Sequence, residues 1–118
     1  MYTLEQLKMF NDMPFLVFVK GEDLKYVYGN KQFLDLVGYD SLDELVGKSD
    51  HEMIWSGYVD TLNENDRIAL NSDEPVNTDE SSDIPGKGRV GARVCKFPAT
   101  VDGKKCLMGV AIYDNESS

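Results

Sequence analysis

The sequence predicts an α+β domain in which an antiparallel sheet has helices packed on one face. Residues 13–39 contain two short runs of β-forming residues followed directly by a short amphipathic helix. Residues 89–113 form a long candidate hairpin around Asp102–Gly103, a strong type I′ turn signal. The segment between these two units has mainly helical periodicity. The expected order is therefore a helix, two strands, three helical pieces and three strands.

The size and charge of the chain limit what it can do. Its 118 residues suit one domain, and 21 acidic against 12 basic residues give a net charge of −9. An acidic domain repels phosphate backbones, so we expect this domain to bind no nucleic acid. No apolar run approaches the ~20 residues that span a bilayer, and the start of the chain lacks a signal peptide pattern. We expect a cytoplasmic protein without membrane contact.

The first half of the chain gives clear element boundaries. Thr3–Asn11 is predicted to be an amphipathic helix opened by a T-x-x-Q capping box. Phe15–Lys20 and Leu24–Gly29 are rich in β-forming residues and predict two strands. Asn30 is a suitable N-cap for the next helix, and Gly38 a suitable stop.

The second half begins with a helical turn, for which Ser41 starts a second capping-box pattern. Ser56–Asn71 has the longest helical periodicity in the chain. A short strand is expected at Val76–Glu80, followed by a loop at 81–88. The closing hairpin then has its two strands at Arg89–Val101 and Lys104–Tyr113.

The register of this hairpin predicts the state of the two cysteines. It places Cys106 opposite Ala99 and Cys95 opposite Val110. The thiols then share a face but lie four positions apart, about 13 Å at strand rise. A disulfide needs Cα atoms within about 7 Å, so we expect both thiols to be reduced. The same face holds Cys95, Phe97, Met108, Val110 and Ile112.

Three ordered segments give the chain a family resemblance. They are N-K-x-F-x-x-x-x-G-Y from Asn30, S-x-D-E-L-x-G-K-x-D from Ser41, and a closing hairpin with F-P, D-G-K and G-V-A. In this order and spacing, the chain resembles the PAS domain family from Phe10 to Asp114. The resemblance implies a five-stranded antiparallel sheet in the order 2-1-5-4-3, with a small cavity between helices and sheet.

The resemblance also implies a role. PAS domains sense ligands, cofactors or redox state, or act as dimerisation and relay modules, and are not usually enzymes. We expect residues 13–114 to form the PAS domain and 115–118 to begin a linker to an output domain, such as a helix-turn-helix regulator or a histidine kinase. Since Met1 stands just before the fold, we expect the domain to be N-terminal in its parent, unless Met1 comes from cloning. Residues 1–12 are expected to mediate homodimerisation or signal transfer through Leu4, Leu7 and Phe10.

Twelve residues are candidates for the cavity wall, although each would serve equally well as ordinary core. They are Phe18, Val27, Phe33, Val37, Met53, Trp55, Tyr58, Leu62, Asp66, Phe97, Met108 and Val110. Asp66 differs from the others because it sits near the apolar face of its helix, where a carboxylate needs a hydrogen-bonding partner. That partner could be backbone, a tyrosine or a small polar ligand.

The cofactor is left open, with two exclusions. Light-sensing relatives have G-x-N-C-R-F-L where this chain has Gly47–Met53, and Asp50 replaces the reactive cysteine, so a covalent flavin adduct is excluded there. Haem is not expected, since His51 is the only histidine and precedes the long helix that supplies the ligand in haem-binding members. The acidic residues at 73–83 lack the spacing of a calcium loop, and no metal site is expected.

The leading hypothesis is therefore a sensory or relay PAS domain that is not an enzyme. One alternative is a stand-alone protein that binds a small molecule. A more remote one is a small enzyme using Asp66 or Glu80 as base. A single histidine leaves no Ser/His/Asp or Cys/His set for hydrolytic chemistry.

Overall fold

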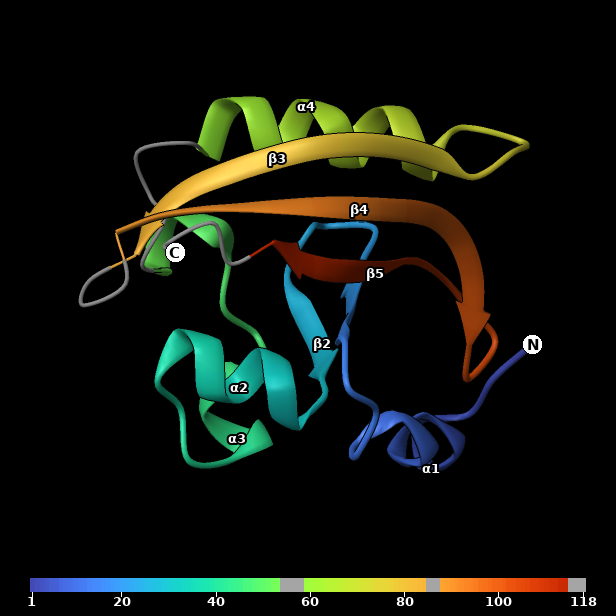
Figure 1. The fold of residues 1–118 in the computed structure, drawn as a ribbon. Helices are drawn as coiled ribbons and strands as arrows, with labels where there is room; N and C mark the ends of the chain where they lie inside the picture. Colours follow the sequence, from blue (N-terminus) through green and yellow to red (C-terminus); the bar gives the residue numbers. More distant parts are fainter. Residues whose placement is uncertain (54–58, 85–87, 115–118) are drawn as a thin grey trace.

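The computed structural model describes residues 1–53, 59–84 and 88–114. A five-stranded antiparallel sheet runs through it in the order β2-β1-β5-β4-β3, which confirms the predicted order (Figure 1). The two strands nearest the N-terminus lie at one end, and β5 returns to pair with β1. The strands are β1 (Leu16–Gly21), β2 (Tyr26–Gly29), β3 (Val76–Ile84), β4 (Gly88–Val101) and β5 (Lys104–Asp114).

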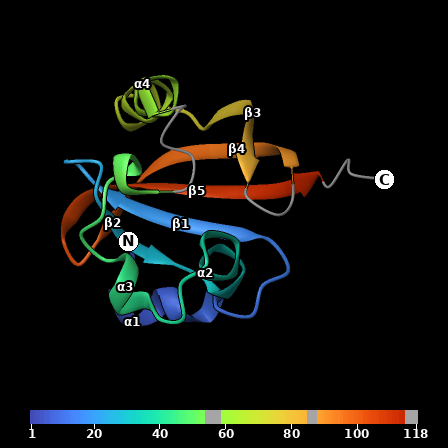
Figure 2. The ribbon, with the colours of Figure 1, turned by 90° about the vertical axis from the view of Figure 1, so that its left-hand side faces the viewer.

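Short helices connect the strands. They are α1 (Leu4–Leu7), α2 (Lys31–Val37), α3 (Leu42–Leu45) and α4 (Val59–Leu70), with 3-10 turns η1 (Lys8–Phe10) and η2 (Asp50–Glu52). α2 packs on β1, α3 on β2, and α4 on β4 with β5 and β3. α4 therefore lies at the β3 end of the sheet, and α2 and α3 at the β2 end (Figure 2). None of the helices in the described ranges is long and apolar enough to cross a membrane.

The predicted caps are mostly confirmed. Thr3 and Gln6 form the predicted capping box at α1. The Asn30 side chain accepts from the N–H of Phe33, and Gly38 ends α2 at φ 81°. At α3 the prediction was wrong in detail, because the Ser41 side chain makes no capping hydrogen bond. Glu44 instead accepts from the backbone N–H of Asp40 at 3.1 Å.

The predicted loop at 81–88 was the largest error in the element boundaries. β3 continues to Ile84, β4 begins at Gly88, and the two strands pair from Ser81↔Gly91 to Ile84↔Gly88. Polar residues had suggested a loop, but an edge strand pairs through its backbone and tolerates polar side chains. The predicted helix at Ser56–Asn71 begins at Val59 within the described residues, and 56–58 lie outside them.

The closing hairpin confirms the predicted turn and register. Asp102 and Gly103 have φ values of 49° and 78°, the positive values that a type I′ turn requires. Cys95 pairs with Val110 and Ala99 with Cys106, and both cysteines are free.

The two faces of the sheet bury separate hydrophobic clusters. The face beneath α2, α3 and α4, called the inner face, holds Leu16, Phe18, Tyr26, Phe33, Val37, Leu45, Met53, Val94 and Ala111. The opposite face, called the outer face, holds Leu7, Val17, Val19, Tyr28, Val101, Cys106 and Met108. The N-terminal segment therefore packs on its own sheet, on the face opposite the other helices.

Phe18 lies at the centre of the inner face between two glycines. Its cross-strand partners are Gly29 on β2 and Gly109 on β5. A Cβ on Gly109 would lie 2.1 Å from an atom of the Phe18 ring, and a Cβ on Gly29 would lie 2.7 Å from Phe33 and from Leu45. The two glycines thus leave the space that the aromatic rings occupy.

Asn30 joins the N-terminal segment to α2. It is fully buried, and its side-chain oxygen accepts from the N–H groups of Val17 and Phe33, both at 3.1 Å. Its side-chain N–H groups donate to the carbonyls of Phe10 at 3.0 Å and Phe15 at 2.7 Å. These four bonds fix the start of β1, the start of α2 and the end of η1 to one another.

Candidate functional site

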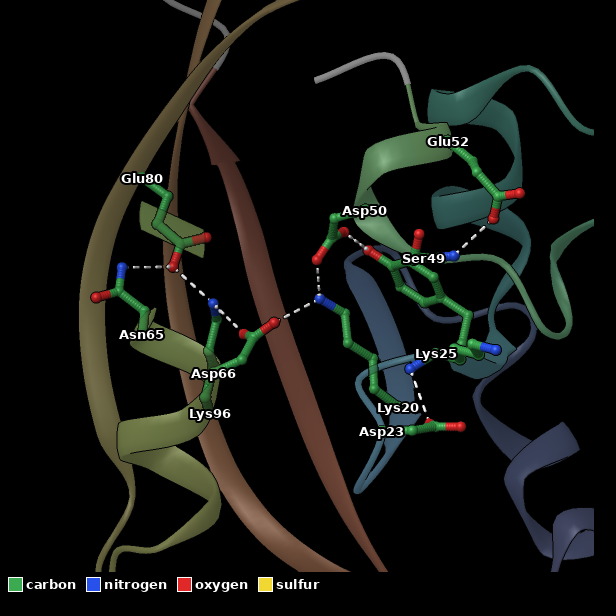
Figure 3. A network of polar contacts seen from close by, with 11 residues as sticks. Lys20, Asp23, Lys25, Ser49, Asp50, Glu52, Asn65, Asp66, Glu80 and Lys96 are labelled. Carbon is green, nitrogen blue, oxygen red and sulfur yellow. Dashed lines mark hydrogen bonds and ion pairs between the residues drawn. The ribbon is translucent and has the colours of Figure 1, made fainter. Parts of the chain in front are cut away.

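Five charged side chains lie in a row across the inner face, between the sheet and the elements that cover it (Figure 3). Asp50, Asp66, Lys20 and Lys96 are at most 2% exposed, and the Glu80 side chain is 15% exposed. Charged residues are rarely buried to this extent unless they are paired. We call these five residues the buried charge network.

Positive and negative groups alternate along the network. Lys20 Nζ lies 2.5 Å from Oδ2 of Asp50 and 2.5 Å from Oδ2 of Asp66. Lys96 Nζ lies 2.6 Å from Oδ1 of Asp66 and 2.8 Å from Oε2 of Glu80. Asp66 therefore bridges the two lysines and ties α4 to both β1 and β4.

Strand alternation and one capped turn position these groups. Lys20 follows Leu16 and Phe18 on the inner side of β1, since every second side chain points to the same face. Lys96 follows Val94 in the same way on β4. Asp50 begins η2, whose capping box uses the neighbouring Ser49 and Glu52.

Neutral polar groups bond both ends of the network. At the β2 end, the hydroxyl of Tyr26 donates to Oδ1 of Asp50 at 2.7 Å. At the β3 end, Oε2 of Glu80 also accepts from the Thr78 hydroxyl at 2.9 Å and from the Asn65 amide at 3.4 Å. The carboxylates are thus held by hydrogen bonds as well as by ion pairs.

The surroundings keep Tyr26 neutral and Lys96 charged. Burial, then the negative charges of Asp50, Asp66 and Glu80, raise the pKa of Tyr26 well above its usual value. Burial by itself would lower the pKa of Lys96, but the carboxylates of Asp66 and Glu80 outweigh it, and the pKa is raised. Lys96 is therefore an ammonium donor at neutral pH and not an amine nucleophile.

Aromatic rings form the apolar side of the site. The ring centroids of Phe18, Tyr26 and Phe33 lie 5.3 to 6.2 Å apart. Lys20 Nζ lies 4.8 Å from the Tyr26 ring centroid and 5.6 Å from that of Phe18. The Lys20 ammonium thus contacts both carboxylates and ring faces, and the negative faces of aromatic rings attract a cation.

Six of the predicted cavity residues come together on the inner face. Phe18, Phe33, Val37 and Met53 belong to its cluster, Leu62 packs against that cluster, and Asp66 lies in the network. The expected need of Asp66 for a partner is confirmed, but its partners are two lysines. That these six residues hold a ligand stays a prediction, and Trp55 and Tyr58 lie outside the described residues.

Four of the predicted cavity residues lie on the outer face, so the prediction that they line a cavity on the inner face was wrong. Val27, Phe97, Met108 and Val110 belong to or pack against the outer cluster, with Leu7 of α1. The predicted register was correct in grouping three of them with Cys95. Periodicity, however, shows only which residues share a face and not which element covers it.

One of the predicted dimer contacts is also wrong. Leu7 is fully buried in the outer cluster and offers no surface to a second chain. Leu4 is 46% exposed and Phe10 is half-buried, so these two stay predictions. Met9, which the sequence did not single out, is more exposed than either.

The sequence reasoning missed Lys20, Tyr26, Asp50 and Lys96. A signal existed, because both lysines occupy inward positions of apolar strands, at the end of FLVFVK and between Cys95 and Phe97. Among the described residues, no group of three or more His, Cys, Asp or Glu is arranged to hold a metal ion. His51 is exposed in η2.

A family model described as the PAS fold matches residues 10–114. The chain belongs to the PAS family. No curated protein is similar enough in sequence to count as a relative. The chain is thus a PAS sensory domain whose inner face contains the buried charge network.

Solved structures of other proteins share the fold. VqmA of Vibrio cholerae, in a complex with ligand and DNA, superposes with a TM-score of 0.81 at 19% identity, over 96% of this chain and 52% of that one. The PAS domain of an HTR-like protein from Haloarcula marismortui superposes with a TM-score of 0.68 at 18% identity, over 93% of this chain and 90% of that one. The PAS domain of Bordetella pertussis BvgS superposes with a TM-score of 0.63 at 18% identity, over 96% of this chain and 86% of that one. The chain spans about half the length of the VqmA chains.

Proposed function

We propose that this PAS domain binds a small polar ligand on its inner face, beside the buried charge network, and thereby controls an output domain. The observation behind the proposal is the burial of two lysines and three carboxylates where the fold needs only an apolar core. Desolvating five charges costs free energy. Replacing a buried ion pair by apolar residues often leaves the stability of a protein unchanged or raises it. A polar ligand site is a reason for such a cluster to exist.

The output would be a DNA-binding regulator, with a histidine kinase as the alternative. VqmA, which shares the fold, has been solved with ligand and DNA, and a second structure describes its dimer. These neighbours support a homodimeric ligand sensor that acts on DNA through another domain. For this chain we propose a cytoplasmic homodimer with contacts at Leu4 and Phe10, without covalent flavin or haem.

An enzymatic role has less support. Both candidate bases, Asp66 and Glu80, are ion-paired with Lys96 at 2.6 and 2.8 Å. Each carboxylate therefore already accepts from a buried ammonium group, and Asp66 does so with both of its oxygens.

Native mass spectrometry tests the proposal. Protein purified from its own host should show an extra mass that disappears on denaturation. Protein stripped by unfolding and refolding should regain that mass, and unfold at a higher temperature, when exposed to the host's small-molecule extract. Stripped protein exposed to buffer alone is the matched control. A ligand-free native mass together with an unfolding temperature that the extract leaves unchanged would contradict the proposal.

A further inference from the structure

The buried ammonium of Lys96 has one N–H donor that bonds to none of the described residues. A lysine ammonium has three N–H groups. That of Lys96 donates to Asp66 and Glu80, and no third acceptor lies within reach among the residues that the structure describes. Lys96 is only 2% exposed, so bulk water does not cover this donor. A buried polar group left without a partner requires an explanation.

One acceptor next to it also has no partner among the described residues. Oε2 of Glu80 receives Lys96, Thr78 and Asn65, whereas Oε1 accepts from no residue in the described ranges. In Figure 3 the dashed lines from Glu80 all reach one oxygen, and the other has none. Lys96 Nζ lies 2.8 Å from the shared carboxylate, so the spare donor and spare acceptor are neighbours.

We propose that the ligand is an uncharged molecule with a hydrogen-bond acceptor and a donor on neighbouring atoms, as in an amide, bound by Lys96 and Glu80. The ligand carbonyl would accept from Nζ of Lys96, and its N–H would donate to Oε1 of Glu80. This inference rests on the proposed function, because it names the class of ligand that the inner face would bind.

The charges around the pair argue against an ionic ligand. An anion would accept from Lys96 but would face the carboxylates of Glu80 and Asp66. A cation would donate to Glu80 but would lie beside the ammonium groups of Lys96 and Lys20. An uncharged ligand lacking either group would leave the buried Lys96 donor or the partly buried Glu80 acceptor unpaired, and sites built to bond such a group reject analogues that lack it.

Three molecules of nearly equal shape separate these possibilities. Benzamide offers one acceptor and a donor, benzoate only acceptors, and benzamidine only donors. Titrations of the ¹⁵N-labelled full chain would follow the backbone amides of Lys96 and Glu80 by NMR. We expect saturable shifts with benzamide and at least tenfold weaker binding of the two ions, the usual effect of one lost hydrogen bond to a charged group. N,N-dimethylbenzamide, which lacks the donor, should also bind at least tenfold more weakly.

A matched pair of variants tests the role of Glu80. Glu80→Gln replaces one carboxylate oxygen by a donor and removes a negative charge, so benzoate binding should rise at least tenfold relative to benzamide. Glu74→Gln, at an exposed glutamate outside the network, should keep the wild-type order. Thermal unfolding of both variants would check the fold, and the wild-type titrations need no variant.

The outcomes distinguish this inference from the proposed function. Benzoate or benzamidine binding as tightly as benzamide, or benzamide failing to displace a ligand found by mass spectrometry, would overturn the inference alone. If no native ligand is retained or regained and none of the probes shifts these amides, both fail.

Discussion

Asp66 is the residue whose loss should disturb the network most. Its two oxygens accept from the two buried lysines, so Asp66→Asn leaves each ammonium with one carboxylate fewer. Removing one partner of a buried ion pair typically destabilises a protein by about 3–5 kcal/mol. We expect a loss of that size in the free energy of unfolding, measured by urea denaturation at pH 7.

Asp60→Asn is the control for this prediction, since Asp60 lies on the same helix but is exposed. It should change stability by less than about 1 kcal/mol. Equal effects of the two substitutions would mean that the network contributes nothing beyond the helix itself.

A substitution at Gly109 would test whether the Phe18 ring needs the space that a side chain at position 109 would fill. Gly109→Ala places a methyl group 2.1 Å from a Phe18 ring atom and forces the ring to move. Overpacking of this kind costs about 1–3 kcal/mol. Gly91→Ala, where a Cβ meets nothing within 4 Å, should be much milder. Calorimetry of both variants would check this, and Phe18→Leu added to Gly109→Ala should recover part of the loss.

At the scale of elements, the buried side-chain amide of Asn30 joins the N-terminal segment to the rest of the fold. Asn30→Asp removes the two donors that hold the carbonyls of Phe10 and Phe15. The Phe15 carbonyl then loses its hydrogen bond from Asn30, whereas the Phe10 carbonyl keeps the one it accepts from the N–H of Met13. A buried acceptor left unpaired costs about 1–3 kcal/mol. We expect hydrogen exchange to rise first in residues 2–11, before the rest of the sheet. Asn71→Asp, which removes only an exposed bond to the Arg67 carbonyl, should leave that exchange unchanged.

The two leucines of α1 should separate folding from association. Leu7→Ala empties a fully buried position and should cost about 2–5 kcal/mol of stability. Leu4→Ala changes an exposed side chain and should cost less than about 0.5 kcal/mol. By analytical ultracentrifugation, Leu4→Ala should weaken a dimer formed through α1. An unchanged dimer would remove Leu4 from the interface.

At the scale of the whole molecule, stability should fall in alkaline solution. Burial, followed by the charge of Asp12, raises the pKa of Tyr28 to about 12, and the pKa values of Tyr26 and Lys96 are raised as well. Above pH 10 the unfolded chain loses protons that the folded chain keeps, so folding becomes less favourable as pH rises. The contribution of Tyr28 is complete below about pH 10 and lost by about pH 12.

Urea denaturation between pH 8 and 11 would measure this slope. Each group can contribute up to about 1.4 kcal/mol per pH unit while only the unfolded state titrates. Tyr28→Phe should flatten the slope, because phenylalanine has no proton to lose. A wild-type stability that stays constant to pH 11 would contradict the prediction.

Local signals were enough for much of the fold. The Asp102–Gly103 turn, the Asn30 cap and the Gly38 stop depend on neighbours within a few residues, and all three are confirmed. The edge strand after Glu80 was missed because its pairing with 88–91 is not local. A polar sequence does not show whether its backbone has a partner.

By itself, the sequence determined the strand order through its family resemblance, the hairpin register and the free state of both cysteines. The tertiary structure decided which face of the sheet each strand residue serves. It places Phe97 and Met108 on the outer face. It also shows that five charged residues lie together on the inner face, namely Lys20, Asp50, Asp66, Glu80 and Lys96. The physical reason is that alternation fixes two sets of side chains per strand, whereas packing of distant elements decides which set is covered, and by what.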